Sequence, residues 1–179
     1  GDISLKEYKE DASQLFRGAK NTKIEIQYIR QGKTQNATII LDDVEIKAVP
    51  FFSLLKDNTG YIVLTKFTEK ASFETKAALL ELKKQGATKI ILDLRGNPGG
   101  LLHEAVNICN LFVPKNELIV TTKSKNPKHN LEYRTKNEPI DLEIPLVVIV
   151  DGKSASASEI VAGAIQDLDR GVVLGTISF

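Results

Sequence analysis

The sequence has few of the residues that bind metals or form cross-links. Its 179 residues include one cysteine and two histidines. A single cysteine excludes an internal disulfide, and the apolar run around Cys109 indicates a small core residue rather than a reactive thiol. His103 and His129 lie far apart, and no close spacing of Cys or His predicts a zinc site. We therefore expect neither a metal nor another cofactor.

Long apolar runs and an excess of one charge are also missing. No stretch of about 18 apolar residues could form a membrane span, and the first residues lack the pattern of a signal peptide. Because 24 basic residues stand against 23 acidic ones, nothing in the charge suggests a nucleic-acid partner. With 42% hydrophobic residues, a chain of this length can bury a sizeable core. We expect one domain, or one domain with part of another.

The segment 1–47 predicts one helix and two strands. Apolar residues recur at helical spacing over residues 5–16, and Gly18 follows where a helix would stop. Apolar and polar residues alternate over 23–30 and 34–41, which predicts two strands joined by a turn. Because two strands and a helix cannot bury a core alone, we interpret this segment as the back part of a small β-rich domain whose other strands would precede residue 1.

After Pro50, segments with strand and helix patterns alternate. Helices are predicted at 71–85, about 101–112 and about 156–168, strands at 60–67, 89–94, 145–150 and 171–175, and extended segments near 118–123 and 131–136. This βαβα order predicts an α/β domain with a largely parallel sheet, helices packed outside it, and ligand chemistry at the ends of the strands.

The first strand-loop-helix junction carries a glycine-rich loop. The buried strand delivers Asp93 and Arg95, which we expect to support the loop, and the residues 96–100 follow with the sequence GNPGG. Glycines allow positive φ angles and a close approach of backbone N–H groups to a bound atom, and such amides ahead of a helix suit an anion or oxyanion. A tight turn formed by the same residues is the alternative interpretation.

The second junction carries three serines at alternate positions. The strand PLVVIV is followed by Ser154, Ser156 and Ser158 at the start of a predicted helix, where the helix dipole favours a developing negative charge. One of them could therefore be a nucleophile. The alternative is a capping box, because Ser156 and Glu159 fit the Ser-x-x-Glu pattern. Local periodicity does not choose among the three serines.

Three stretches in order, GYIVLTKF, LDLRGNPGG and GKSASASEIVAGAIQD, resemble the carboxyl-terminal processing (tail-specific) proteases of serine peptidase family S41. The resemblance implies a ClpP/crotonase-like α/β protease core over residues 48–179, preceded by the C-terminal part of a PDZ-like domain over 1–47. It also implies an endopeptidase that cleaves polypeptides near their C-termini, with those tails as its partners. A bacterial cell-envelope location is a further expectation from the family.

The resemblance also implies roles for individual residues. It places the nucleophile at Ser156, with Ser154 and Ser158 as structural neighbours. The oxyanion hole would consist of the amide of Ala157 and one amide of the glycine-rich loop, Gly99 first and Gly100 as the alternative.

In the family the general base is a buried lysine that follows a Gly-Glu-x-Thr/Ser-Phe/Tyr segment. Here that segment reads Gly-Thr-Ile-Ser-Phe, with Thr176 in place of the usual Glu, and the lysine is expected about two residues beyond Phe179. We therefore expect the 179-residue chain by itself to be inactive.

Two rival functions stay open. A non-catalytic homologue could bind peptide tails without cutting them, and a crotonase-like acyl transferase or hydrolase could use the same paired amides. Among other polar residues, Lys153 is expected in a solvated loop, because it lies three residues from Ser156 and cannot easily act as its base. We expect His103 in the first turn of a helix and His129 in a solvated loop.

Overall fold

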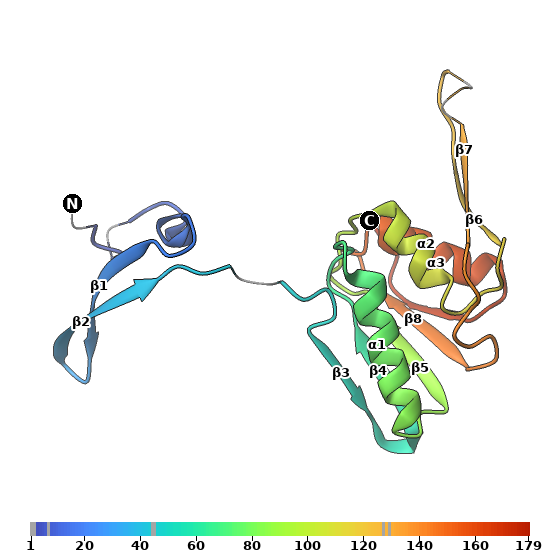
Figure 1. Cartoon of the computed structure of the whole chain (residues 1–179), viewed down its shortest axis with the longest axis horizontal. Coiled ribbons are helices and arrows are strands. Elements are labelled where there is room, and N and C mark those ends of the chain that lie inside the picture. Colours follow the sequence, from blue (N-terminus) through green and yellow to red (C-terminus); the bar gives the residue numbers. More distant parts are fainter. Residues whose placement is uncertain (1–2, 7, 44–45, 127, 129) are drawn as a thin grey trace. The chain divides into compact units, whose positions relative to one another are not determined.

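The computed structural model describes residues 3–6, 8–43, 46–126, 128 and 130–179. The chain divides into two compact units, Gly1–Ile46 and Lys47–Phe179 (Figure 1).

The first unit is a β-hairpin with one short helix. Strands β1 (Lys23–Arg30) and β2 (Lys33–Ile40) pair antiparallel, as the alternation predicts. The prediction of a helix over 5–16 is wrong for most of its length, because only the 3-10 helix η1 (Ala12–Phe16) forms. No described residue of this unit is buried, so a longer helix would have no core against which to pack its apolar face.

The second unit contains a five-stranded sheet in the order β3-β4-β5-β8-β9. Its strands are β3 (Phe51–Leu54), β4 (Thr59–Val63), β5 (Lys89–Asp93), β8 (Leu146–Val150) and β9 (Val172–Gly175). The last four run parallel to one another, which confirms the largely parallel α/β prediction. Strand β3 is antiparallel to β4, follows Pro50 and was not predicted, because four residues give too little alternation to recognise. The 3-10 helix η2 (Lys56–Asn58) joins these two strands.

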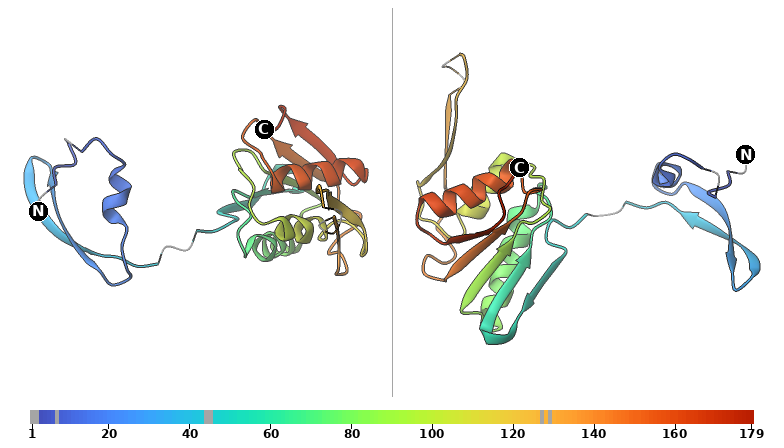
Figure 2. Two further views of the ribbon diagram at one scale, coloured as in Figure 1. Left: turned by 90° about the horizontal axis from the view of Figure 1, so that it is seen from above. Right: turned by 180° about the vertical axis from the view of Figure 1, so that it is seen from behind.

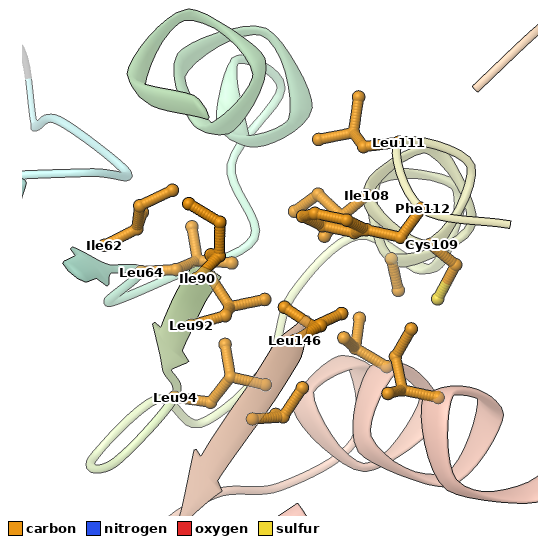
Figure 3. Close-up of a cluster of buried hydrophobic side chains, with 14 of the residues drawn as sticks. Ile62, Leu64, Ile90, Leu92, Leu94, Ile108, Cys109, Leu111, Phe112 and Leu146 are labelled. Atoms are coloured by element: carbon orange, nitrogen blue, oxygen red, sulfur yellow. The ribbon is translucent and has the colours of Figure 1, made fainter. Parts of the chain in front are cut away.

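Three helices, α1 (Ala71–Lys84), α2 (Leu102–Cys109) and α3 (Ala157–Asp167), form a layer in which α2 packs against both of the others. Figure 3 shows the side chains that fill the space between these helices and the strands. In β8, buried and half-buried residues alternate, so one face of this parallel strand is closed more completely than the other. The helix layer therefore covers one face of the sheet and packs beside the loops that join strands and helices.

A separate two-stranded ribbon leaves this unit between α2 and β8. Strands β6 (Leu118–Thr122) and β7 (Leu131–Arg134) pair antiparallel, and Figures 1 and 2 show them running away from the sheet and the helices. Among the residues that the structure describes, no helix is long and apolar enough to cross a membrane.

Candidate active site

The glycine-rich loop and the serine loop leave the same edge of the sheet. The first follows β5 and the second follows β8, and these two strands are parallel neighbours with Leu92 opposite Val148. The carboxyl ends of adjacent parallel strands bring their following loops together. Two segments about sixty positions apart in the sequence thus lie side by side.

Asn97 joins the two loops through its backbone and its side chain, and it is fully buried. Its carbonyl oxygen accepts hydrogen bonds from the Ala155 N–H at 3.1 Å and from the Ser158 hydroxyl at 3.0 Å. Its side-chain Oδ1 accepts from the Gly99 N–H at 2.9 Å, and its Nδ2 donates to the Leu64 carbonyl at 2.8 Å. The sequence pattern predicts no role for this residue by itself. Its place directly before the Pro-Gly-Gly turn was the available signal.

Gly99 lies against the backbone of the serine loop. Its φ is 98°, and a Cβ added there would come within 2.6 Å of the Ala155 oxygen, 2.8 Å of the Ser156 Cβ and 3.0 Å of the Ala157 nitrogen. Only a residue without a side chain fits such an approach. The structure therefore brings the glycine-rich loop and the serine loop into contact, with Gly99 beside the residues that start α3.

The three serines differ sharply in exposure. Ser154 and Ser158 are fully buried, and their hydroxyls donate to the carbonyl oxygens of Leu94 at 2.8 Å and Asn97 at 3.0 Å. Ser156 is exposed and has φ 55° and ψ −113°, a conformation that is uncommon for any residue other than glycine. Two serines thus hold the loops together, and only Ser156 offers its hydroxyl to solvent.

Ser156 is also the N-cap of α3, as the capping pattern predicts. Its backbone N–H donates to Glu159 Oε2 at 2.7 Å, as a capping box requires. The other oxygen of Glu159 accepts the Ser178 hydroxyl at 2.9 Å, and the Phe179 N–H donates to the Ser154 carbonyl at 3.1 Å. Ser156 can therefore cap α3 and still expose its hydroxyl. The bonds of Ser178 and Phe179 hold the segment that follows β9 against the serine loop.

The backbone amides of Ala157 and Gly100 have no acceptor among the residues that the structure describes. The Gly99 N–H, in contrast, is satisfied by Asn97. Gly99 is also buried, and Gly100 is exposed. The Gly100 N–H is therefore free to donate to a bound atom, whereas the Gly99 N–H is already used within the loop. With the dipole of α3, the amides of Ala157 and Gly100 can stabilise a negative charge beside Ser156.

Comparisons with known proteins identify the family of this chain. The model of the family "Peptidase family S41" matches residues 58–179, about two thirds of the chain. The chain belongs to peptidase family S41.

Similar S41 relatives cover most of this chain. A carboxyl-terminal-processing protease of Synechocystis sp. is 37% identical over 175 residues, which are 95% of this chain and 40% of the relative. A "Probable CtpA-like serine protease" of Staphylococcus saprophyticus is 34% identical over 163 residues, 91% of this chain and 33% of the relative. The chain thus spans about a third to two fifths of the length of these curated relatives.

Solved structures of the family share the fold. The photosystem II D1 C-terminal processing protease superposes with a TM-score of 0.65 at 28% identity, over 90% of this chain and 45% of that chain. A putative S41 protease from Bacteroides fragilis gives the same TM-score at 19% identity, over 87% of this chain and 47% of that chain, and shows the fold alone.

Asp93 and Arg95 form a polar cluster below the S41 glycine-rich loop. The Arg95 guanidinium lies 2.6 Å from Asp93 Oδ2, and the Tyr61 hydroxyl donates to the same oxygen. Burial works to raise the pKa of Asp93, but the hydrogen bonds from Arg95 and Tyr61 outweigh it, so the pKa is lowered from its usual value. Burial and the bond to Asp93 raise the pKa of Tyr61. This ionised cluster supports the start of the loop.

Among the described residues, His103, Lys153 and Cys109 form no hydrogen bond with Ser156 or with the glycine-rich loop. His103 is exposed in the first turn of α2, and Lys153 is exposed in the serine loop, as expected. His129 lies outside the described residues. Cys109 is fully buried, and burial raises the pKa of its thiol to about 12. No group of three or more His, Cys, Asp or Glu residues that could hold a metal occurs within the described part of the chain.

Proposed function

We propose that the full-length protein is a serine endopeptidase that cleaves polypeptides near their C-termini through an acyl-enzyme at Ser156. The observation that carries the proposal is the exposed Ser156 hydroxyl beside two unpaired amides, those of Gly100 and Ala157. Membership of family S41 and the C-terminal-processing relatives support the substrate class.

The proposed reaction follows from this arrangement. The Ser156 oxygen attacks the carbonyl carbon of the scissile peptide bond, and the carbonyl oxygen becomes an anion that accepts hydrogen bonds from the two amides. Loss of one such donor raises the barrier by roughly 2.7–4 kcal/mol. The hydroxyl proton passes to a general base and then to the leaving amine. Water subsequently hydrolyses the acyl-enzyme and releases Ser156.

The general base in this proposal is a lysine about two residues beyond Phe179, as the family resemblance implies. Support comes from the segment 178–179, which the bonds to Glu159 and to the Ser154 carbonyl hold against the serine loop. A lysine buried near Ser156 would lose part of its preference for the charged form and could accept the proton. On this proposal the 179-residue chain by itself does not turn over substrate.

We further propose that residues 1–47 are the C-terminal part of a PDZ-like domain that presents the substrate tail. The antiparallel pair β1–β2 and the lack of any buried described residue in this unit fit a piece of a larger β domain. A bacterial cell-envelope location remains part of the proposal on the strength of the family alone.

The experiment uses the full-length protein and a peptide with an apolar C-terminal tail. Ser156→Ala should lower kcat by about 10⁴-fold or more, since loss of a catalytic serine leaves only a small residual rate. A fluorophosphonate should label Ser156 in the wild type. Ser124→Ala, in an exposed loop remote in sequence, is the control and should retain full activity. Cleavage that survives Ser156→Ala would refute the proposal.

A second candidate function is a non-catalytic homologue that binds peptide tails. Thr176, which stands where the family pattern has Glu, favours it. Binding of tail peptides by the full-length protein, with no turnover and no fluorophosphonate labelling, would support this candidate over the first.

A further inference from the structure

The β6–β7 ribbon has a fixed base. The buried Thr135 donates its hydroxyl to the Pro114 carbonyl at 2.6 Å and accepts the Glu117 N–H at 2.8 Å. The buried side chain of Asn110, at the end of α2, accepts hydrogen bonds from the backbone of residues 136–137 and donates one back to Asn137. Buried polar bonds thus set the direction in which the ribbon leaves the body.

Among its described residues, the ribbon packs against the body only at its base, where the partly buried Ile119 lies against the core. Every described residue over 118–134 is exposed or half-buried, and Figures 1 and 2 show the far part of the two strands running away from the sheet and the helices of their unit. A two-stranded hairpin is marginally stable in water by itself. The described part of the hairpin beyond this base adds nothing to the core, which points to a contact outside the molecule.

The far part of the ribbon carries one sign of charge. Residues 118–131 contain Lys123, Lys125 and Lys128 and no Asp or Glu. All three lysines are exposed, and none forms an ion pair with a described residue. The chain as a whole has a formal net charge of only +1, so this cluster is a local feature. We call residues 118–134 the basic arm.

The composition of the basic arm favours one kind of anionic partner. All three cations near its tip are lysines, which act as flexible point charges, whereas the planar fork of arginine recognises individual carboxylates and phosphates in a fixed geometry. Arg134, at the base, is already paired with Glu132 at 2.8 Å. Leu131, opposite Thr122 in the far part of the arm, is 52% exposed. Mobile cations beside an exposed apolar side chain suit a charged lipid surface.

We propose that the basic arm contacts the headgroups of anionic phospholipids and so orients the protein at a membrane surface. This contact is separate from catalysis and does not depend on the proposed function. Three lysines at such a surface together favour an anionic over a neutral bilayer by roughly 100-fold. Since clusters of about 4–8 basic residues are typical of stronger lipid binding, the contact is weak and sensitive to salt.

The test measures sedimentation of the 179-residue chain with vesicles. In one set about a third of the lipid is phosphatidylglycerol and the rest phosphatidylcholine, and the other set is phosphatidylcholine alone. The wild type should bind the anionic vesicles roughly 100-fold better, and the variant K123Q/K125Q/K128Q should lose most of that preference. Binding should fall as salt rises from about 0.05 M to about 0.5 M.

The matched control removes the same charge from exposed lysines of the body, as K76Q/K84Q/K89Q, and should keep the preference. Equal losses in the two variants would overturn the proposal, because net charge would then explain the binding. Equal binding to heparin or duplex DNA, with the same lysine dependence, would overturn it in favour of a general polyanion site. If the arm variant self-associates and its vesicle binding is unchanged, the lysines protect the ribbon's open edges instead.

Discussion

Gly99→Ala tests whether the two loops form one site. Gly99 has φ 98°, and an alanine Cβ would lie 2.6 Å from the Ala155 oxygen and 2.8 Å from the Ser156 Cβ. Neither neighbour can rotate away, because one is a backbone atom and the other is fixed to the backbone of α3's first turn. The substitution must therefore move the glycine-rich loop and the serine loop apart.

The structure sets the size of the effect. Ordinary van der Waals contact begins at 3.4 Å, so the 2.6 Å approach must open by about 0.8 Å. A misplacement of about 1 Å at reacting groups can lower the rate about 100-fold. The backbone conformation itself also costs about 1–2 kcal/mol of folding free energy for a residue with a Cβ. We expect kcat/KM of the full-length protein to fall about 100-fold.

Gly86→Ala is a matched control for the backbone term. Gly86 follows the C-cap of α1 with φ 96°, and a Cβ there meets nothing within 4 Å. Both variants carry the same conformational strain, and only Gly99→Ala adds the contact with the serine loop. The assays are peptide cleavage, the rate of fluorophosphonate labelling, and thermal unfolding. If both variants lose stability equally and Gly99→Ala cleaves as fast as Gly86→Ala, the claim that these loops share a catalytic site is refuted.

Two further predictions concern the ionisable side chains of Asp93 and Cys109. Because Asp93 has a lowered pKa in the folded chain, its contribution to stability is present above the unfolded value of about 3.8 and is lost as pH falls through the folded one. Asp93→Asn should thus lower the free energy of unfolding by about 1–3 kcal/mol at pH 7. In urea titrations this loss should shrink at about pH 3, and a constant loss would contradict the assignment. Cys109 should resist a thiol reagent at about pH 8 until the chain is unfolded, since its pKa of about 12 and complete burial keep it protonated and inaccessible; rapid labelling of the folded chain would disprove this.

The sequence predicted the second unit well because its signals are local and strong. Apolar runs such as KIILD and LVVIV form β5 and β8, and each is followed by a loop and then a helix. The first unit was predicted less well, because the apolar residues spaced for a helix over 5–16 have no core to pack against. Apolar periodicity produces a helix mainly when a neighbouring element covers the apolar face, and none of the described residues there is buried.

In the site, too, local sequence pattern predicted the position of the loops, whereas packing decides which of their groups are exposed. The pattern located both loops, but it could not tell which of three serines is exposed or which glycine amide is free, because both depend on Asn97. Asn97 fixes the residues on either side of Ser156 by accepting from Ala155 and Ser158, and it consumes the amide of Gly99. The positive φ of Ser156 is a strain of roughly 1–3 kcal/mol, which persists only where surrounding contacts over-determine it. A single buried asparagine thus holds the serine in an exposed, strained position and takes up the amide of Gly99, while the amides of Gly100 and Ala157 have no acceptor among the described residues.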